Sequence, residues 1–128
     1  MILEVWTYKA TNPSNGAVKP RPVLIIGNDG KNGFYFADIH YCIISSSAKG
    51  GIYDVVIDTN EAAEIGLSSV SVIKTTKLYT GSESFLGGKI GDLPKDLAKQ
   101  FVNKYKEYQS QIINQLEMLD GDIEGFKI

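Results

Sequence analysis

Residues 19–27 read KPRPVLIIG, a charged and proline-containing entry into an unbroken apolar run that ends at a glycine. A short run of this kind is typical of a strand covered on both faces, so we expect a central strand of a sheet over residues 21–27. Pro20 and Pro22 restrict their own φ angles and bias the residues before them toward extended backbone. The sequence therefore predicts a stiff, extended entry into a buried strand.

Arg21 lies between the two prolines and is the only arginine of the chain, against twelve lysines. Its planar guanidinium can bind a phosphate or a carboxylate through two parallel hydrogen bonds, which a lysine cannot do. We therefore interpret Arg21 as an anion-binding residue that rigid backbone holds in place. The alternative on these residues alone is an ordinary surface salt bridge.

Further strands are expected on both sides of this stretch, because β-branched and aromatic residues recur between turns rich in glycine and asparagine. The expected strands cover residues 2–10, 34–47, 52–57 and 70–80, with a loop over 11–20 and tight turns at 28–33 and 48–51. Such turns favour antiparallel pairing of consecutive strands. A short helix is expected over 59–67, with Thr59 or Asn60 as its N-cap and Gly66 as its C-cap.

The clearest helix of the chain is expected from Pro94 to Leu119. Proline suits the first helical position, and an apolar stripe that packs on the sheet or on a partner chain recurs at helical spacing. The stripe consists of Leu97, Phe101, Tyr105, Tyr108, Ile112, Leu116 and Leu119. These elements together predict an α+β protein dominated by β structure. We expect a single domain over 1–128, with a curled sheet in about 1–93, the helix in 94–119 and a tail in 120–128.

Length and composition indicate a single-domain protein without an overall positive charge. The chain of 128 residues has the size of one domain, and a net charge of −2 with a pI near 5.3 gives no overall attraction for nucleic acid. Any site for a polyanion must therefore be local. The lone Cys42 has no partner for an internal disulfide and is expected to pack inertly in a strand. Since no signal-peptide pattern or membrane-spanning run occurs, we expect a soluble protein of the cytoplasm.

Several catalytic chemistries lack the residues that they need. His40 and Cys42 alone are too few for a metal site, and no cofactor is expected. The glycines between residues 81 and 91 do not match a phosphate-binding loop, and no serine stands in a glycine-flanked nucleophile elbow. His40 is interpreted as a structural residue, and the pattern leaves open whether it or Asp38 faces a groove.

A cluster of hydroxyl side chains follows the strand that comes after Arg21. Ser45, Ser46 and Ser47 stand where that strand ends, shortly before two glycines. Adjacent hydroxyls beside flexible backbone can donate several hydrogen bonds to one phosphate. Arg21 begins one strand and Ser45 ends the next, so antiparallel pairing of the two would bring them together. A polar turn that merely caps the strand is the alternative for the triplet alone.

Four segments of the chain are similar in order and spacing to those of one known family. They are KPRPVLIIG at 19–27, IISSS at 43–47, EIGLSSVSVIKTTKLYT at 64–80 and FLGGKIGDLPKDLAKQ at 85–100. Through them the chain resembles the PemK/MazF toxin family from about Glu4 to Phe101. The resemblance implies a small SH3-like barrel with a C-terminal helix, a homodimer, and a metal-independent endoribonuclease that an antitoxin neutralises.

The resemblance also implies roles for individual residues. The arginine of the family's arginine-proline motif matches Arg21, and its catalytic threonine after the third strand matches Ser45, with Ser46 as the next-best match. In the implied reaction, the 2′-hydroxyl of single-stranded RNA attacks its own phosphodiester and leaves a 2′,3′-cyclic phosphate and a 5′-hydroxyl. Arg21 would stabilise the dianionic phosphorane, and Ser45 would assist.

Four further residues are expected to bind the substrate, namely Lys19, Ser46, Ser47 and Lys74. Lys74 is included because some members of the family carry an arginine at the matching position. Two other functions stay open at this point. The chain could be a catalytically inactive PemK-like module that binds a protein or a nucleic acid through the same groove, or a structural domain that dimerises through the long helix.

Overall fold

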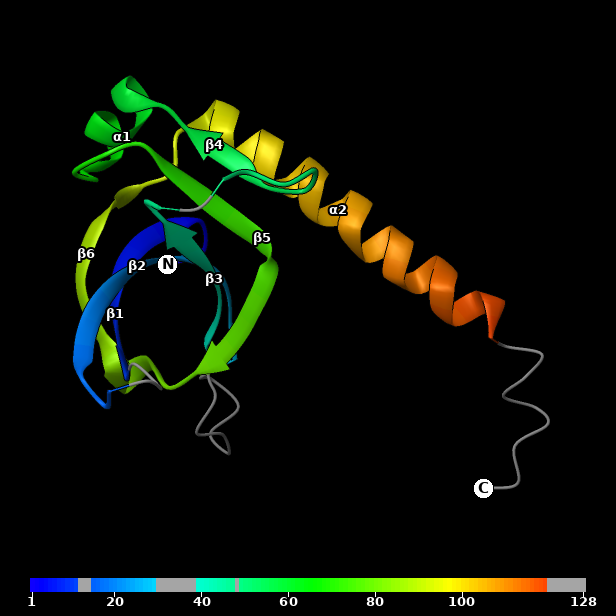
Figure 1. Cartoon of the computed structure of the whole chain (residues 1–128), viewed down its shortest axis with the longest axis horizontal. Helices are drawn as coiled ribbons and strands as arrows, with labels where there is room; N and C mark the ends of the chain where they lie inside the picture. Colours follow the sequence, from blue (N-terminus) through cyan, green and yellow to red (C-terminus); the bar gives the residue numbers. More distant parts are fainter. Residues whose placement is uncertain (12–14, 30–38, 48, 120–128) are drawn as a thin grey trace.

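The computed structural model describes residues 1–11, 15–29, 39–47 and 49–119. Within these ranges the chain forms one antiparallel sheet with the strand order β4-β5-β3-β2-β1-β6, together with helical segments (Figure 1). The strands are β1 (Glu4–Thr11), β2 (Val18–Asn28), β3 (Ile39–Ser45), β4 (Val55–Ile57), β5 (Ser71–Gly81) and β6 (Leu86–Asp92). The helical segments are α1 (Thr59–Ile65), the 3-10 turn η2 (Glu83–Phe85) and α2 (Lys95–Met118). The prediction of an α+β protein dominated by a curled sheet is confirmed.

The sheet curls so strongly that its strands nearly close into a ring (Figure 1). Tyr8 on β1 and Gly81 on β5 come together although β2 and β3 lie between their strands in the sheet order. A Cβ atom added at Gly81 would overlap the Tyr8 hydroxyl. The sheet therefore curls toward the face that carries Tyr8, and glycine is needed at the point where the two strands approach each other.

Two hydrophobic clusters pack on the two faces of the sheet. The first, which we call the helix face, lies against α1 and α2 and includes Val5, Leu24, Cys42, Ile44, Ile73, Leu97 and Phe101. The second, which we call the tyrosine face, carries Tyr8, Val23, Ile25, Ile39 and Tyr41. The expected burial of Cys42 is confirmed. Burial, together with the nearby charge of Asp54, raises the pKa of the Cys42 thiol to about 12, so the thiol stays protonated at neutral pH.

The hairpin between β1 and β2 is tighter than the sequence predicts. The bounds of the loop expected over 11–20 are wrong, because Thr11 pairs with Val18 and Lys9 pairs with Pro20, so both ends of this segment belong to strands. Prolines are tolerated here because β2 pairs with β3 only from Val23 onward, so the first part of β2 has a partner on one side alone. Side chains that a loop would scatter are thus held in strand register beside β1.

Strand β6 is absent from the sequence prediction. Gly87, Gly88 and Gly91 interrupt any alternation of apolar and polar residues, and glycine is a poor strand former. The segment is nevertheless extended because it pairs with β1, from Glu4 opposite Asp92 to Tyr8 opposite Leu86. Its strand character therefore depends on residues about eighty positions away in the sequence.

Helix α1 is capped by a residue that the sequence analysis passes over. The Asp58 carboxylate accepts a hydrogen bond from the Glu61 N–H at 2.8 Å, and the Glu61 carboxylate accepts one from the Asp58 N–H at 3.1 Å. This reciprocal capping box makes the prediction of Thr59 or Asn60 as N-cap wrong. Gly66 is confirmed as the C-cap, with a left-handed φ of 110°.

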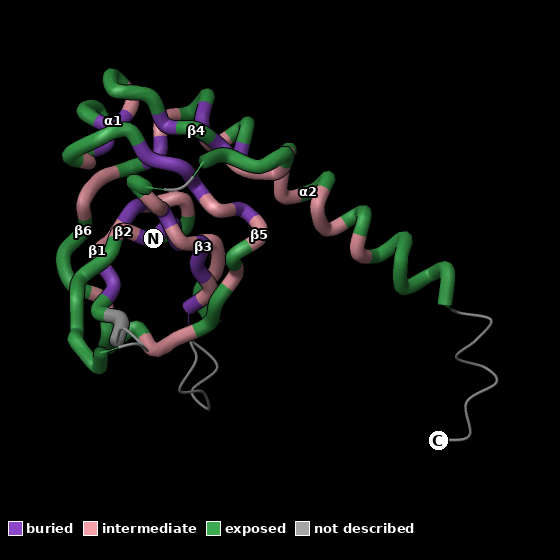
Figure 2. Tube along the Cα trace, viewed as in Figure 1, coloured by how far each residue is buried: buried purple, intermediate pink, exposed green. Residues whose placement is uncertain are grey.

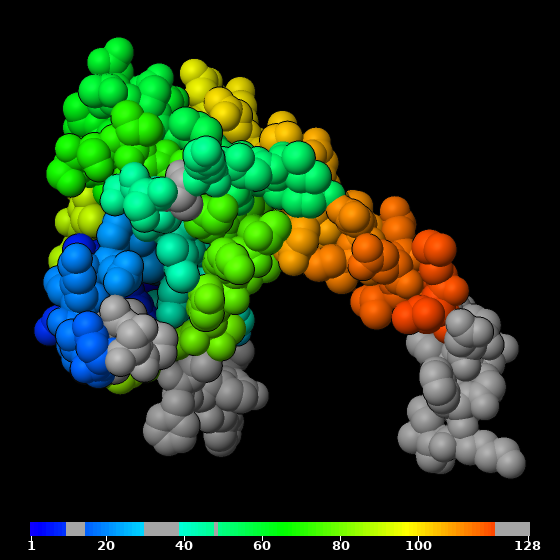
Figure 3. Space-filling view, in the orientation of Figure 1, coloured from blue at the N-terminus to red at the C-terminus, as the bar shows by residue number. Residues whose placement is uncertain are grey.

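Helix α2 packs on the body of the protein as far as Gln111, whose side-chain oxygen accepts a hydrogen bond from the Tyr53 hydroxyl. Leu97 and Phe101 are buried, whereas Leu116 is 58% and Met118 83% exposed. Beyond Gln111 the helix is largely solvent-exposed (Figure 2) and projects away from the sheet (Figure 3). The expected tail at 120–128 lies outside the described residues. Among the described helices, none combines the length and apolar character needed to cross a membrane.

Candidate functional site

Arg21 and Ser45 lie at the same end of two neighbouring strands. Val23 on β2 pairs with Ile43 on β3, and Arg21 and Ser45 are each two residues farther toward this end. Side chains alternate between the faces of a strand, so both residues belong to the face that carries Val23. This is the tyrosine face, and it brings together the arginine and the hydroxyl that the sequence analysis selects.

Two cations, Arg21 and Lys19, lie on this part of the tyrosine face. Arg21 pairs across the sheet with Tyr8, and Lys19 lies two residues before Arg21 on the same side of β2. Both side chains are exposed, and within the described part of the chain neither has an ion-pair partner. A permanently charged guanidinium without a carboxylate partner is available to an anionic ligand.

The serine cluster offers one hydroxyl that is already oriented. The Ser45 Oγ accepts a hydrogen bond from the Ser47 N–H at 3.3 Å and lies 3.5 Å from the Ser47 Oγ. Since the backbone N–H occupies a lone pair of this oxygen, the Ser45 O–H remains able to donate to a phosphoryl oxygen. Ser45 is partly buried, whereas Ser46 and Ser47 are exposed.

Lys74 lies close to Ser45, but its ammonium group forms an ion pair with Asp54. Lys74 on β5 is the cross-strand partner of Ile43 on β3. Ile43 lies two residues before Ser45 on the same face of β3. Its Nζ donates to the Asp54 carboxylate at 2.6 Å and to the Lys49 carbonyl at 3.5 Å. The Asp54 side chain is only 4% exposed. Lys74 therefore adds little net positive charge to a bound phosphate, and its ion pair anchors the segment before β4.

Asp54 is a residue that the sequence analysis does not select. Its carboxylate also accepts hydrogen bonds from the Gly51 N–H at 2.8 Å and the Thr75 N–H at 3.2 Å. These bonds hold residues 51–54 as a turn, so the strand expected at 52–57 is reduced to Val55–Ile57. The only signal in the sequence is a single acidic residue beside a short apolar run, which does not distinguish a buried anchor from a surface charge.

The pKa of Asp54 makes its contribution to stability depend on pH. Burial alone raises this pKa, but the hydrogen bonds from Lys74, Gly51 and Thr75 outweigh burial and hold the pKa below its ordinary value. A carboxyl whose pKa is lower in the folded than in the unfolded chain stabilises the fold fully above its unfolded pKa, near 4, and loses this effect as the pH falls through the folded pKa.

Replacement of this carboxylate tests the anchor. We expect Asp54→Asn to lower the free energy of unfolding at pH 7 by about 2 kcal/mol, because a hydrogen-bonded ion pair is lost, and expect the deficit to shrink as the pH falls below about 4. Urea unfolding across this pH range measures both effects. Asp92→Asn is the matched control, because Asp92 forms an exposed ion pair with Lys89. An equal loss in both variants would contradict the role of Asp54.

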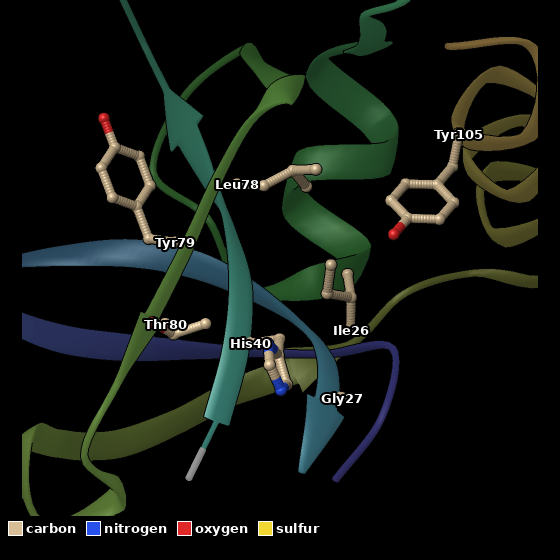
Figure 4. Close-up of a pocket in the computed structure, with 7 residues that line it drawn as sticks. All are labelled: Ile26, Gly27, His40, Leu78, Tyr79, Thr80 and Tyr105. Atoms are coloured by element: carbon tan, nitrogen blue, oxygen red, sulfur yellow. The ribbon is translucent and has the colours of Figure 1, made fainter. Parts of the chain in front are cut away.

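His40 lies on the other side of β3 from Ser45. Its ring Nε2 lies 2.5 Å from the Asp29 carboxylate, and Gly27 leaves room for the ring. His40 lines a cavity of about 420 Å³ with Ile26, Gly27, Leu78, Tyr79, Thr80 and Tyr105 (Figure 4). The site of Arg21 and Ser45 therefore does not include His40. Asp38 lies outside the described residues, and no group of three or more metal-binding side chains occurs in the described ranges.

A comparison with protein families identifies the class to which this chain belongs. The family described as "PemK-like, MazF-like toxin of type II toxin-antitoxin system" matches residues 3–107. The chain belongs to this family, as its four sequence segments predict. Among curated proteins, no sequence matches the chain.

Solved structures show the same fold. The chain is similar to Mycobacterium tuberculosis toxin MazF-mt6, with 22% identity, coverage of 80% of this chain and 93% of that chain, and a TM-score of 0.59. It is also similar to an endoribonuclease in complex with its cognate antitoxin from a mycobacterial species, with 10% identity, coverage of 86% and 94%, and a TM-score of 0.63. It is similar as well to the MazE–MazF structure (Form-II) from Deinococcus radiodurans, with 19% identity, coverage of 84% of this chain and 92% of that chain, and a TM-score of 0.58. The small SH3-like barrel of the PemK/MazF type is thereby confirmed.

Proposed function

We propose that this member of the PemK/MazF family is a metal-independent endoribonuclease that cleaves single-stranded RNA. The observation that carries the proposal is the placement of Arg21 and Ser45 at one end of β2 and β3, on one face of the sheet. The exposed guanidinium lacks an ion-pair partner in the described ranges, which suits a residue that binds phosphate.

The proposed reaction needs no nucleophile from the protein. The 2′-oxygen of the substrate bonds to the adjacent phosphorus, and the bond from phosphorus to the 5′-oxygen breaks. The 2′-hydroxyl loses its proton, and the leaving 5′-oxygen gains one, so the reaction consumes no net proton. The products are a 2′,3′-cyclic phosphate and a 5′-hydroxyl. The protein must stabilise the dianionic phosphorane, and fixed donors directed at developing charge provide the largest part of such stabilisation.

Each residue has a distinct part in this proposal. Arg21 donates two hydrogen bonds to the phosphorane oxygens, and Ser45 donates the O–H that its bond from the Ser47 N–H leaves free. Lys19 attracts the backbone of the RNA strand, and Ser46 and Ser47 bind neighbouring phosphoryl oxygens. The part left to Lys74 is small, because Asp54 compensates its charge.

We also propose the partners and the compartment of this toxin. An antitoxin polypeptide neutralises it, by analogy with the mycobacterial endoribonuclease that is in complex with its cognate antitoxin. The chain acts as a homodimer in the cytoplasm. The exposed Leu116 near the end of α2 and Leu119 at its C-cap provide apolar surface for such a dimer. Light scattering of the purified chain tests the dimer.

The test of the function is incubation of the protein with a defined single-stranded RNA in EDTA, followed by analysis of the fragment ends. We expect cleavage that EDTA leaves unchanged, with cyclic phosphate at the 3′ side of each cut and a 5′-hydroxyl on the next fragment. RNA that is bound but left intact would support the catalytically inactive module instead. RNA that is neither bound nor cut would overturn the proposal.

A further inference from the structure

Four aromatic rings from four elements form a row. The ring centroids of Phe85 and Tyr8 are 6.0 Å apart, those of Tyr8 and Tyr41 are 4.6 Å apart, and those of Tyr41 and Tyr79 are 5.8 Å apart. We call Phe85, Tyr8, Tyr41 and Tyr79 the aromatic row. These separations lie in the range in which aromatic side chains attract one another.

The two end rings of the aromatic row are exposed to solvent, and the two middle rings are buried. Tyr8 and Tyr41 are 8% and 9% exposed, whereas Tyr79 and Phe85 are 46% and 51% exposed. Each exposed ring packs on a buried one, Phe85 on Tyr8 and Tyr79 on Tyr41. Figure 4 shows that Tyr79 points away from Leu78 and Tyr105, so the ring does not fill the cavity that its neighbours line.

The aromatic row shares its face of the sheet with Arg21 and Lys19. Tyr8 is the cross-strand partner of Arg21, and Lys19 precedes Arg21 on the same side of β2. Burial, with a smaller contribution from the neighbouring Tyr8, raises the pKa of Tyr41 to about 12, so this hydroxyl stays protonated at neutral pH. Exposed aromatic rings beside cations that form no ion pair within the described ranges suit a ligand that has both flat apolar faces and negative charge.

We propose that the exposed rings of Tyr79 and Phe85 stack against unpaired bases of a single-stranded RNA whose phosphates bind Arg21 and Lys19. Every base has an aromatic face, so stacking of this kind accepts different sequences, and a cationic track beside it binds the backbone. The inference rests on the proposed function, because it assigns to the same RNA a second set of contacts on the tyrosine face. An apolar protein segment would leave the cations beside the rings without a counterion, whereas the phosphates of the RNA backbone pair with them.

Binding of an uncleavable RNA tests the row without any catalytic step. A single-stranded 2′-O-methyl RNA, whose blocked 2′-oxygen prevents the proposed reaction, is titrated with the full chain and followed by fluorescence anisotropy. Tyr79→Ala and Phe85→Ala are each expected to weaken binding by about tenfold. Tyr79→Phe keeps the ring and should bind like the original chain, whereas Tyr79→Leu keeps apolar bulk without the ring and should bind weakly.

Two controls separate stacking from other effects. An abasic strand of the same length keeps the phosphates but has no bases, so Tyr79→Ala should not change its binding, while Arg21→Ala should weaken it. Ile113→Ala removes a similarly exposed apolar side chain on α2, 49% exposed, and should leave RNA binding unchanged. Thermal melting of every variant checks the fold.

The outcomes distinguish this inference from the proposed function. If the original chain cuts RNA while Tyr79→Ala and Phe85→Ala bind the methylated strand as tightly as it does, the stacking role is overturned and the proposed function stands. An equal loss of binding for the abasic and the normal strand would also overturn stacking. If the original chain neither binds nor cuts RNA, both proposals fail.

Discussion

Arg21→Ala is expected to lower the rate of RNA cleavage by on the order of 100- to 1000-fold. The reason is that removal of one fixed donor to a developing oxyanion costs about 2.7–4 kcal/mol of transition-state stabilisation. The side chain is exposed and makes no ion pair in the described ranges, so its loss should leave the fold intact. Single-turnover cleavage of a defined RNA in EDTA, with thermal melting alongside, measures both effects.

Two further variants show whether the guanidinium acts through its position and shape. Arg21→Lys keeps the charge but loses the planar pair of donors, so we expect a rate between those of the original chain and Arg21→Ala. Lys9→Ala removes an equal charge from an exposed site one row away, where Lys9 pairs with Pro20 and points to the opposite face of β1. Its rate should be unchanged. Equal losses for Lys9→Ala and Arg21→Ala would reduce the role of Arg21 to general attraction.

Gly91→Ala is expected to be the most destabilising single methyl group that can be added to β6. A Cβ at this position would overlap the Ile65 carbonyl oxygen and lie 2.9 Å from its carbonyl carbon. Both atoms belong to the backbone at the end of α1, which cannot move aside as a flexible side chain does. We expect a loss of about 3 kcal/mol in the free energy of unfolding, and a melting temperature lower by about 10 °C.

Gly88→Ala is the matched control on the same strand. A Cβ at Gly88 has no neighbour within 4 Å, so this substitution adds the same methyl group in open space. Its effect on the free energy of unfolding should stay within about 0.5 kcal/mol. Equal melting temperatures for the two variants would show that α1 does not pack closely against β6 in solution.

The fold was largely accessible from local patterns in the sequence. The apolar run after Pro22 predicts the central strand β2, and the stripe that includes Leu97 and Phe101 predicts α2, because in both cases the periodicity of the chain matches the element that it forms. The same reasoning misplaces the cap of α1 and misses β6. Neither error is surprising, since Asp58 lies outside the apolar pattern and Gly87 and Gly88 interrupt it.

The candidate site is likewise predictable from the sequence in part. The sequence singles out Arg21 by its two flanking prolines and Ser45 by its cluster of hydroxyls, and antiparallel pairing of consecutive strands predicts that the two are neighbours. The engagement of Lys74 by Asp54 could not be predicted, because the two residues are twenty positions apart and belong to different segments of the chain. Their pairing depends on how the segment before β4 folds back on β5.

By itself the sequence determined which segments are strands or helices wherever the apolar pattern is regular, and it determined that a single arginine enters the central strand from rigid backbone. Only the tertiary structure decided that a glycine-rich segment becomes β6, that Asp54 compensates Lys74, and that Tyr8, Tyr41, Tyr79 and Phe85 meet in one row. The physical reason is that local periodicity reports which side of an element is apolar, whereas curling of the sheet sets which distant side chains come into contact.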